Sequence, residues 1–296
     1  MNPVLLMMIG AVSLGFAEAI NGHLLKRFKD ITSVSLIIIG SIVTFILSGI
    51  WLIIFKPPMI ELDIRIVSLI IITGLLWYYA NKNFYNSFKY QDASTSTIVL
   101  MSTIIITTIL GKLIFDESVA LVQWGGVVLV ATAVFLINMG GFHIEGFKKV
   151  FAPNKATKYV LLAALLYGLG NSASKLVVLD VNPHYYQFLD ILLVTPFFIF
   201  FDRKEVKHQL RVLKETKAYL YLAPVIIFYF IYNILRYTSL SMNLELPLAD
   251  AVDNIVVFVI IALEVIIFNI KHVNILFKIV VALIAVAGVL LITFGA

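Results

Sequence analysis

The chain has 296 residues, of which 61% are hydrophobic and only 13% are charged, and it contains no cysteine. This composition excludes a soluble globular domain, in which about a quarter of the residues are charged, and it excludes disulfide frameworks and thiol-based metal or redox sites. The net charge of +5 does not indicate a nucleic-acid partner, because the basic residues collect at the ends of the apolar runs, as membrane topology requires.

The apolar residues form runs of about twenty, the length that an α-helix needs to cross the hydrocarbon core of a bilayer. Within lipid the backbone must be hydrogen-bonded internally, and these runs lack the alternation of barrel strands, so the fold class is predicted to be an all-α integral membrane protein, surrounded by membrane lipid. In chain order the runs predict ten transmembrane helices, at residues 3–25, 32–55, 66–88, 93–113, 119–139, 158–179, 184–201, 218–241, 247–268 and 274–294.

Similar residues recur in the two halves of the chain. Near the ends of the third and eighth spans, three polar residues recur 152 positions apart: Asn81, Tyr85 and Ser87 as Asn233, Tyr237 and Ser239. Gly15 and Gly168 add a shift of 153 and are expected to mark close helix packing. Five spans is an odd number, so two such repeats must insert with opposite orientation. The sequence therefore predicts two inverted five-helix repeats, residues 1–140 and 158–296, joined by residues 141–157, in which 142–151 could form an interfacial helix.

Three local patterns carry a resemblance to a known family. They are the polar passage from Tyr85 to Ser96, the exit Phe115-Asp116-Glu117, and Trp124-Gly125-Gly126 leading into the fifth span. In these the chain resembles the drug/metabolite transporter superfamily, and within it the EamA-like ten-helix permeases. The second half departs from the family pattern at Phe268-Asn269-Ile270-Lys271, where the family often repeats the acidic residue. The resemblance implies a permease and adds amino acids, amines and similar metabolites as substrates.

Polar side chains within the spans identify the candidate site. An ionisable side chain at mid-membrane costs at least about 2.5–3.5 kcal/mol, so it needs a partner, a water-filled cavity or a functional role. Trp77, Asn81 and Tyr85 follow one another at one-turn spacing and could offer one ligand an aromatic wall and hydrogen bonds. The predicted substrate-binding residues are Glu18, Asn21, Trp77, Asn81, Lys82, Tyr85, Asn171, Lys175, Asp190, Asn233, Arg236, Asp250, Asp253 and Asn254.

Some of these charges also have a purely structural interpretation. Arg236 could form a fixed ion pair with Asp250 or Asp253 that only holds helices together. We give this interpretation the same weight as a role in substrate binding. Lys175 and Glu264 lie within about a turn of their span ends, so they are expected to extend toward the headgroups instead.

Catalytic motifs are missing from the sequence. The five histidines show no HExxH spacing, and the chain has neither a GxSxG motif nor a phosphate-binding glycine loop. We therefore expect no enzyme activity, no cofactor and no metal; an intramembrane enzyme using Glu18 or Asp190 as a base is the weakest alternative. A channel would be expected to carry rings of like charge, and the charges here are mixed in sign.

The sequence thus predicts a secondary-active transporter of a small polar metabolite, an amino acid, an amine or a similar zwitterion or cation. It would work by alternating access, with protons as the candidate coupling ion, in the plasma (inner) membrane. A facilitative channel or exchanger for nucleotide-sugar-like anions stays open as the alternative. The odd-numbered loops carry most of the basic residues, whereas the other side has little beyond Lys56 and Arg65, so both termini are predicted outside. Relatives in the family are usually drawn with both termini inside.

Overall fold

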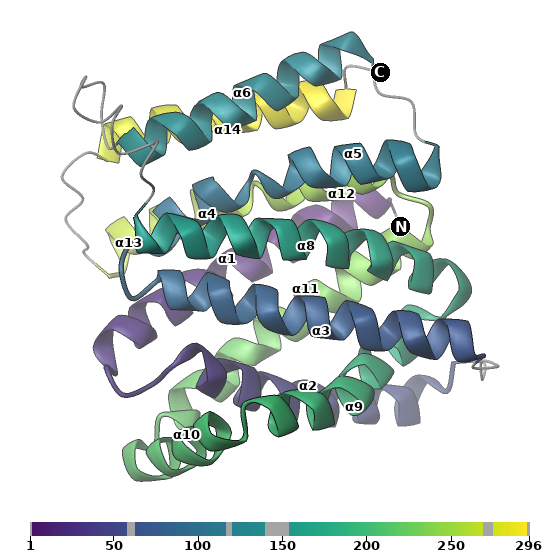
Figure 1. Cartoon of the computed structure of the whole chain (residues 1–296), viewed down its shortest axis with the longest axis vertical. Coiled ribbons are helices and arrows are strands. Elements are labelled where there is room, and N and C mark those ends of the chain that lie inside the picture. The colour runs from purple at the N-terminus through teal and green to yellow at the C-terminus, as the bar shows by residue number, and fades with distance from the viewer. Residues whose placement is uncertain (1, 58–62, 117–119, 140–153, 269–274, 295–296) are drawn as a thin grey trace.

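The computed structural model describes residues 2–57, 63–116, 120–139, 154–268 and 275–294, and these residues form helices and no strand (Figure 1). The helices are α1 (Pro3–Arg27), α2 (Ser33–Phe55), α3 (Ile64–Ser87), α4 (Ala93–Leu100), α5 (Thr103–Phe115), α6 (Leu121–Met139), α8 (Lys155–Asp180), α9 (Pro183–Phe201), α10 (Arg203–Thr216), α11 (Tyr219–Ser241), α12 (Leu246–Asp253), α13 (Val256–Ile266) and α14 (Ile275–Phe294). The all-α prediction is confirmed. The expected interfacial helix at 142–151 lies outside the described residues.

Helix boundaries follow from capping side chains at the polar breaks. The side chain of Asn2 accepts a hydrogen bond from the backbone N–H of Val4, and that of Asn154 accepts one from Thr157, so α1 and α8 begin in the same way. At the other ends, Asp116 and Lys217 adopt left-handed backbone conformations that terminate α5 and α10. The spans therefore start and stop within a few residues of the limits set by hydropathy.

Eight described segments are long and apolar enough to cross a membrane, and two shorter apolar helices, at Leu121–Ile137 and Val256–Ile266, fall where the remaining predicted spans lie. Two predicted spans are not continuous, which corrects the sequence interpretation. The span at 93–113 is divided into α4 and α5, and the span at 247–268 into α12 and α13. The chain is an integral multi-pass membrane protein with two broken helices.

The first break is caused by local side-chain hydrogen bonding. The hydroxyl of Ser102 donates to the carbonyl of Val99 at 2.8 Å, and that of Thr103 donates to the carbonyl of Leu100 at 2.7 Å. Such bonds compete with the helical ladder, and the backbone here tightens to bonds between residues three apart, such as Ile104 N–H to Met101 C=O. Hydropathy cannot detect this change, because the apolar run continues through it.

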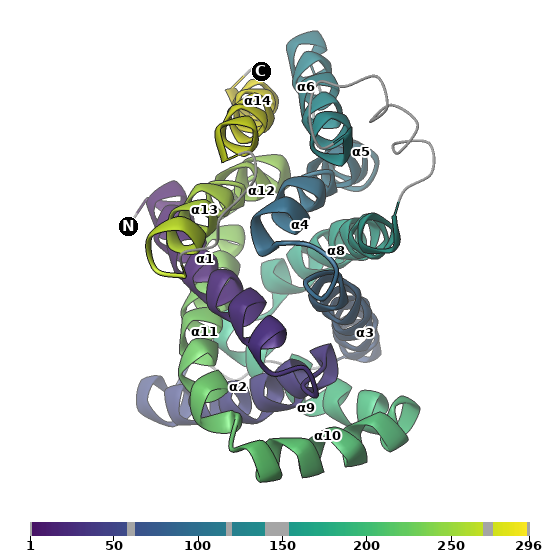
Figure 2. The ribbon, with the colours of Figure 1, turned by 90° about the vertical axis from the view of Figure 1, so that its left-hand side faces the viewer.

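An additional helix, α10, forms between the predicted spans at 184–201 and 218–241. Its Val206, Val212 and Leu213 are buried, and the helix packs against α2 and α9. Gln209 accepts a hydrogen bond from the backbone N–H of Thr32 at 3.2 Å and another from the hydroxyl of Ser35. The helix therefore covers the start of α2, and Figure 2 shows it lying across one side of the bundle.

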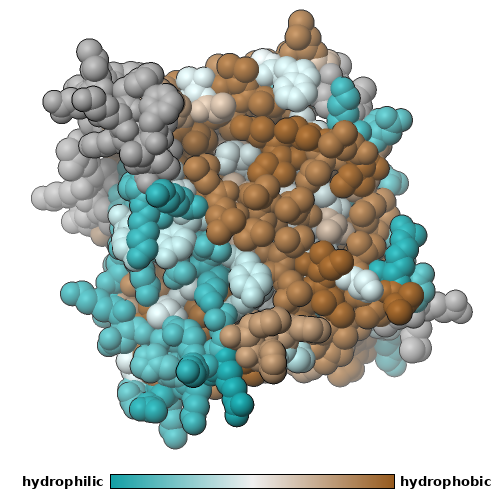
Figure 3. Space-filling model, viewed as in Figure 1, coloured by the Kyte–Doolittle hydropathy of each residue, from teal (hydrophilic) through white to brown (hydrophobic). Residues whose placement is uncertain are grey.

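Close helix pairs organise the bundle. α3 packs along α8, α1 along α11, and α6 along α14, which form a separate pair at one edge (Figure 1). A Cβ added at Gly15 would lie 2.6 Å from Val259, and one added at Gly168 would lie 2.6 Å from Ile106, so the predicted close packing at both glycines is confirmed. On the face shown in Figure 3, apolar side chains cover the middle and the top, and polar ones gather at the lower left and along the right side, where the helices end, as expected for a surface facing lipid.

Candidate functional site

A cavity of about 260 Å³ lies inside the bundle. A water occupies roughly 30 Å³ in the liquid, so the space would hold about nine waters or a small metabolite. Side chains from α1, α2, α3, α4, α5, α8, α9, α11, α12 and α13 line it, whereas no lining residue belongs to α6, α10 or α14. Both broken helices therefore contribute to the wall, and the α6–α14 pair stands outside it.

Most of the sequence-predicted site residues meet at this cavity. The lining includes Glu18, Asn21, Trp77, Asn81, Tyr85, Asn171, Asp190, Asn233, Arg236, Asp250, Asp253 and Asn254. Lys82 and Lys175 are not among the lining residues. The Lys82 ammonium instead lies 2.7 Å from Asp202, and that of Lys175 lies 4.5 Å from the ring centre of Phe115. Lys175 is buried rather than extended to the headgroups.

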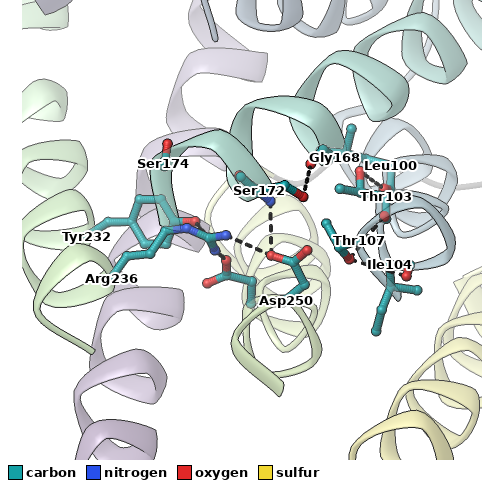
Figure 4. Close-up of polar contacts among 12 residues, drawn as sticks. Leu100, Thr103, Ile104, Thr107, Gly168, Ser172, Ser174, Tyr232, Arg236 and Asp250 are labelled. Carbon is teal, nitrogen blue, oxygen red and sulfur yellow. Dashed lines mark hydrogen bonds and ion pairs between the residues drawn. The ribbon is translucent and has the colours of Figure 1, made fainter. Parts of the chain in front are cut away.

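Arg236 occupies the centre of an ion cluster between α11 and α12 (Figure 4). Its guanidinium donates to Asp250 at 2.7 Å and also pairs with Asp253, so the fixed ion pair expected as one interpretation is present. Tyr232 donates to Asp253 at 2.8 Å, and the Asn171 amide donates to Asp250 at 3.0 Å. The Arg236 side chain is 1% exposed, so both of its acidic partners compensate a charge that is deeply buried.

A second polar group is built around the hydroxyl of Tyr229 on α11. It accepts hydrogen bonds from the Asn21 amide at 3.1 Å and from the Tyr85 hydroxyl at 2.8 Å, and it is hydrogen-bonded to Glu18. Nearby, the Tyr167 hydroxyl donates to the Asn81 side chain at 2.7 Å. Side-chain hydroxyl and amide groups thus join four helices across the cavity, α1, α3, α8 and α11.

A third polar group comes from α9. Gln187 is buried, and neither its amide oxygen nor its amide nitrogen has a hydrogen-bond partner. Asp190, one turn further along, has no partner for its Oδ1 atom, which lies 2.5 Å from where a Cβ on Gly74 would be. Only glycine at this position lets α9 bring the carboxylate so close to α3.

Sequence reasoning missed Gln187 and the lining tyrosines Tyr167, Tyr229 and Tyr232. One pattern could have found the residues on α11, because Tyr229, Tyr232 and Arg236 follow helical spacing on one face. Among the described residues, no group of three or more His, Cys, Asp or Glu side chains could hold a metal ion.

Outside the cavity, an ion-pair cluster closes one end of the bundle. Asp92, just before α4, lies 2.5 Å from the ammonium of Lys26 and 3.1 Å from that of Lys278. Burial raises the pKa of Asp92, but the hydrogen bond from Lys26 and the two ammonium charges outweigh burial and lower the pKa to about 2. Glu264 accepts a hydrogen bond from the backbone N–H of Ser94 at 3.2 Å and is buried, so the expectation that it extends to the headgroups is wrong.

The model of the EamA-like transporter family matches residues 1–139, which confirms the resemblance to the drug/metabolite transporter superfamily. No curated protein matches the chain in a sequence search. A solved crystal structure of a protein aligns with 98% of this chain and 96% of its own, with a TM-score of 0.61 and 12% sequence identity. At that identity the likeness shows a shared fold over nearly the whole length.

Proposed function

We propose that this chain, whose first half matches the EamA-like transporter family, is a secondary-active transporter. It moves a small polar metabolite, an amino acid, an amine or a similar zwitterion or cation, by alternating access. Residues 1–140 and 158–296 are the two inverted repeats of the transporter, residues 141–157 connect them, and the membrane is the plasma (inner) membrane.

Equivalent features in the two halves support the inverted repeat. α4 begins at Ala93 and α12 at Leu246, and after the breaks α5 begins at Thr103 and α13 at Val256, so both starts are shifted by 153 positions. The glycine contacts follow the same shift, since Gly15 meets Val259 where Gly168 meets Ile106. α3 in the first half corresponds to α11 in the second half, and α1 corresponds to α8. The closely packed pair of α3 and α8 therefore has a counterpart in the closely packed pair of α11 and α1.

The observation that carries the proposal is the position of the cavity between the two broken helices. Thr97 and Thr103 flank the first break and Asp250 and Asn254 lie at the second, and all four line the space. In many secondary transporters, discontinuous helices from two repeats form a substrate site near the middle of the membrane. Rocking of one group of helices against the other would open such a site to each side in turn.

The proposed energy source is a gradient across the membrane. The chain contains no phosphate-binding glycine loop, which supports transport driven by a gradient of the substrate, of a counter-substrate or of protons. Glu18 and Asp190 are the candidate proton carriers, because each lines the cavity without a cationic partner among the described residues. The alternative, a channel or exchanger for nucleotide-sugar-like anions, is disfavoured because the lining contains four carboxylates and one guanidinium.

Uptake into liposomes tests the proposal. Purified protein should move a labelled amino acid or amine without ATP, with saturation at high concentration, and Glu18→Gln and Asp190→Asn should each reduce the rate while the protein stays folded. A pH dye inside the vesicles should respond during uptake if protons are coupled. Unsaturable flux with single-channel current would instead indicate a channel, and a chemically altered product without net movement would indicate an enzyme. Full uptake by both variants would remove these carboxylates from the mechanism.

A further inference from the structure

The cavity wall contains more unpaired hydrogen-bond acceptors than donors. Among the described lining residues, seven buried oxygen atoms have no partner: Glu18 Oε2, Asn21 Oδ1, Asn171 Oδ1, Gln187 Oε1, Asp190 Oδ1, Asp250 Oδ2 and Asp253 Oδ1. Only two buried donors are unpaired there, Gln187 Nε2 and Arg236 Nε. Water can donate to these acceptors while the cavity is empty of solute, so a solute that displaces this water loses the least hydrogen bonding if it carries N–H or O–H groups in excess.

The charges in the wall point to the same kind of solute. The one cation in the lining, Arg236, is bound to both Asp250 and Asp253, so its charge is already compensated and only its Nε–H group is unpaired. Lys82 and Lys175 do not line the cavity. A carboxylate entering this space would meet an excess of negative charge and a single cation that two carboxylates already compensate, which raises the free energy of the bound carboxylate.

The strongest candidate for a cation subsite is on α9. Asp190 lines the cavity and has no hydrogen bond to any described residue. Gln187 lies one turn before it, with both amide atoms unpaired. Glu18, in contrast, already has Tyr229 as a hydrogen-bond partner. An ammonium group offers three donors to such acceptors, and charge-assisted bonds of this kind are the stronger ones.

Aromatic side chains complete the description of the ligand. Trp77, Tyr85, Tyr167, Tyr229 and Tyr232 all line the cavity. Aromatic rings attract cations to their faces and bury the apolar body of an amine. We therefore infer that the substrate is an organic cation rich in N–H donors and without a free carboxylate, and that Asp190 and Gln187 bind its ammonium group. This inference rests on the proposed transport function and narrows it from zwitterions and cations to cations alone.

Three solutes that share a five-carbon chain, to which lysine adds a carboxylate, and that differ in charge test the inference. Cadaverine, lysine and glutarate should be compared on the detergent-purified full chain by thermal shift, and in liposomes by uptake, because binding to the folded state raises apparent stability. We expect cadaverine to act at a concentration roughly tenfold or more below that of lysine, the effect of one charge-assisted contact, and glutarate to have no effect. Asp190→Asn should remove the cadaverine response, whereas Glu215→Gln, which removes an exposed acid on α10, should leave it unchanged.

The other possible results would refute different parts of the proposal. Uptake of lysine or glutarate in preference to cadaverine would leave the transporter intact and refute the cation inference. An unchanged cadaverine response in a folded Asp190→Asn protein would refute the assigned subsite. In that case Gln187→Leu should also leave the cadaverine response unchanged. If no solute in the set shifts stability or enters the liposomes, the cation inference fails, and uptake of other labelled amino acids and amines then decides the proposed function.

Discussion

Replacing Arg236 by Met should be among the most destabilising single changes in this protein. Arg236 is 1% exposed, and the side chains of Asp250 and Asp253 that pair with it are 6% and 15% exposed. Removing the guanidinium leaves two buried carboxylates facing each other without a cation. Removing one partner of a buried pair costs about 3–5 kcal/mol, so the free energy of unfolding should fall by roughly that amount.

Lys82 provides the matched comparison. Its ammonium also pairs with a carboxylate, that of Asp202, but the two side chains are 27% and 20% exposed. Burial raises the pKa of Asp202, but hydrogen bonds from Lys82 and Tyr78 lower it more strongly. Partly exposed pairs contribute about 0–1 kcal/mol, so Lys82→Met should have a small effect.

Unfolding in mixed micelles with increasing denaturing detergent, followed by tryptophan fluorescence, would measure both free energies. Asp253→Asn should cost less than Arg236→Met, about 1–3 kcal/mol, because Arg236 keeps Asp250. Combining Arg236→Met with Asn at both acidic positions should restore part of the loss, because no unpaired charge remains. If Arg236→Met costs no more than Lys82→Met, the cluster is not the buried electrostatic unit that its geometry indicates.

Two further predictions use other parts of the bundle. Gly126→Ala should destabilise the protein, because the added Cβ would lie 2.3 Å from the carbonyl oxygen of Gly288. Gly125 has open space around it, so Gly125→Ala should be neutral or stabilise the protein by about 0.5–1 kcal/mol. Equal melting temperatures of the two variants would contradict this prediction. For Asp92, the folded-state pKa is lowered to about 2 from 3.8, so its ion pairs stabilise the protein fully above pH 3.8 and weaken as the pH falls toward 2. The difference in melting temperature between the native protein and Asp92→Asn should therefore stay constant from about pH 5 to 8, and a change within that range would place the pKa elsewhere.

The membrane spans could be predicted from sequence because bilayer thickness imposes a run length that composition reveals directly. α2, predicted at 32–55, is observed at Ser33–Phe55, and α14, predicted at 274–294, is observed at Ile275–Phe294. The breaks could not be predicted in the same way. Polar residues lie at both breaks, Ser102 and Thr103 at the first and Asp253 and Asn254 at the second. Continuous spans such as α8 also contain polar residues, so such residues do not by themselves identify a break.

Part of the candidate site could be predicted from the sequence, because burying a polar group within a span has a free-energy cost. Glu18 and Asp190 were found because a charge in a span needs an explanation. Lys82 has the same signature but pairs with Asp202, 120 positions away, and a sequence pattern does not show which helix ends meet. Tyr229 was missed because a tyrosine in a span is usually an interface or core aromatic, and its role depends on what surrounds its hydroxyl.

The direction of the chain in the membrane can be argued from where basic residues gather. On α10 the exposed Lys204, Lys207, Arg211 and Lys214 follow helical spacing on one face. Lys26 and Lys278 meet at Asp92, so the end of α1 and the start of α14 lie at the same side of the bundle. Most basic side chains outside the spans thus belong to one side.

By the positive-inside rule this side should face the cytoplasm, which puts the start of α1 and, for an even number of spans, the C-terminus outside. The usual family arrangement has both termini inside, and we favour the charge count because it acts directly on insertion. A reporter that fluoresces only in the cytoplasm should be dark after Ala296, whereas one that is active only outside should be active there. Replacing Lys204, Lys207, Arg211 and Lys214 of α10 by Glu should increase the fraction of protein that inserts in the opposite orientation. The reason is that the difference in charge between the two sides of the membrane becomes smaller. Bright cytoplasmic fluorescence from the unaltered, inserted chain would show that this bias does not set the topology.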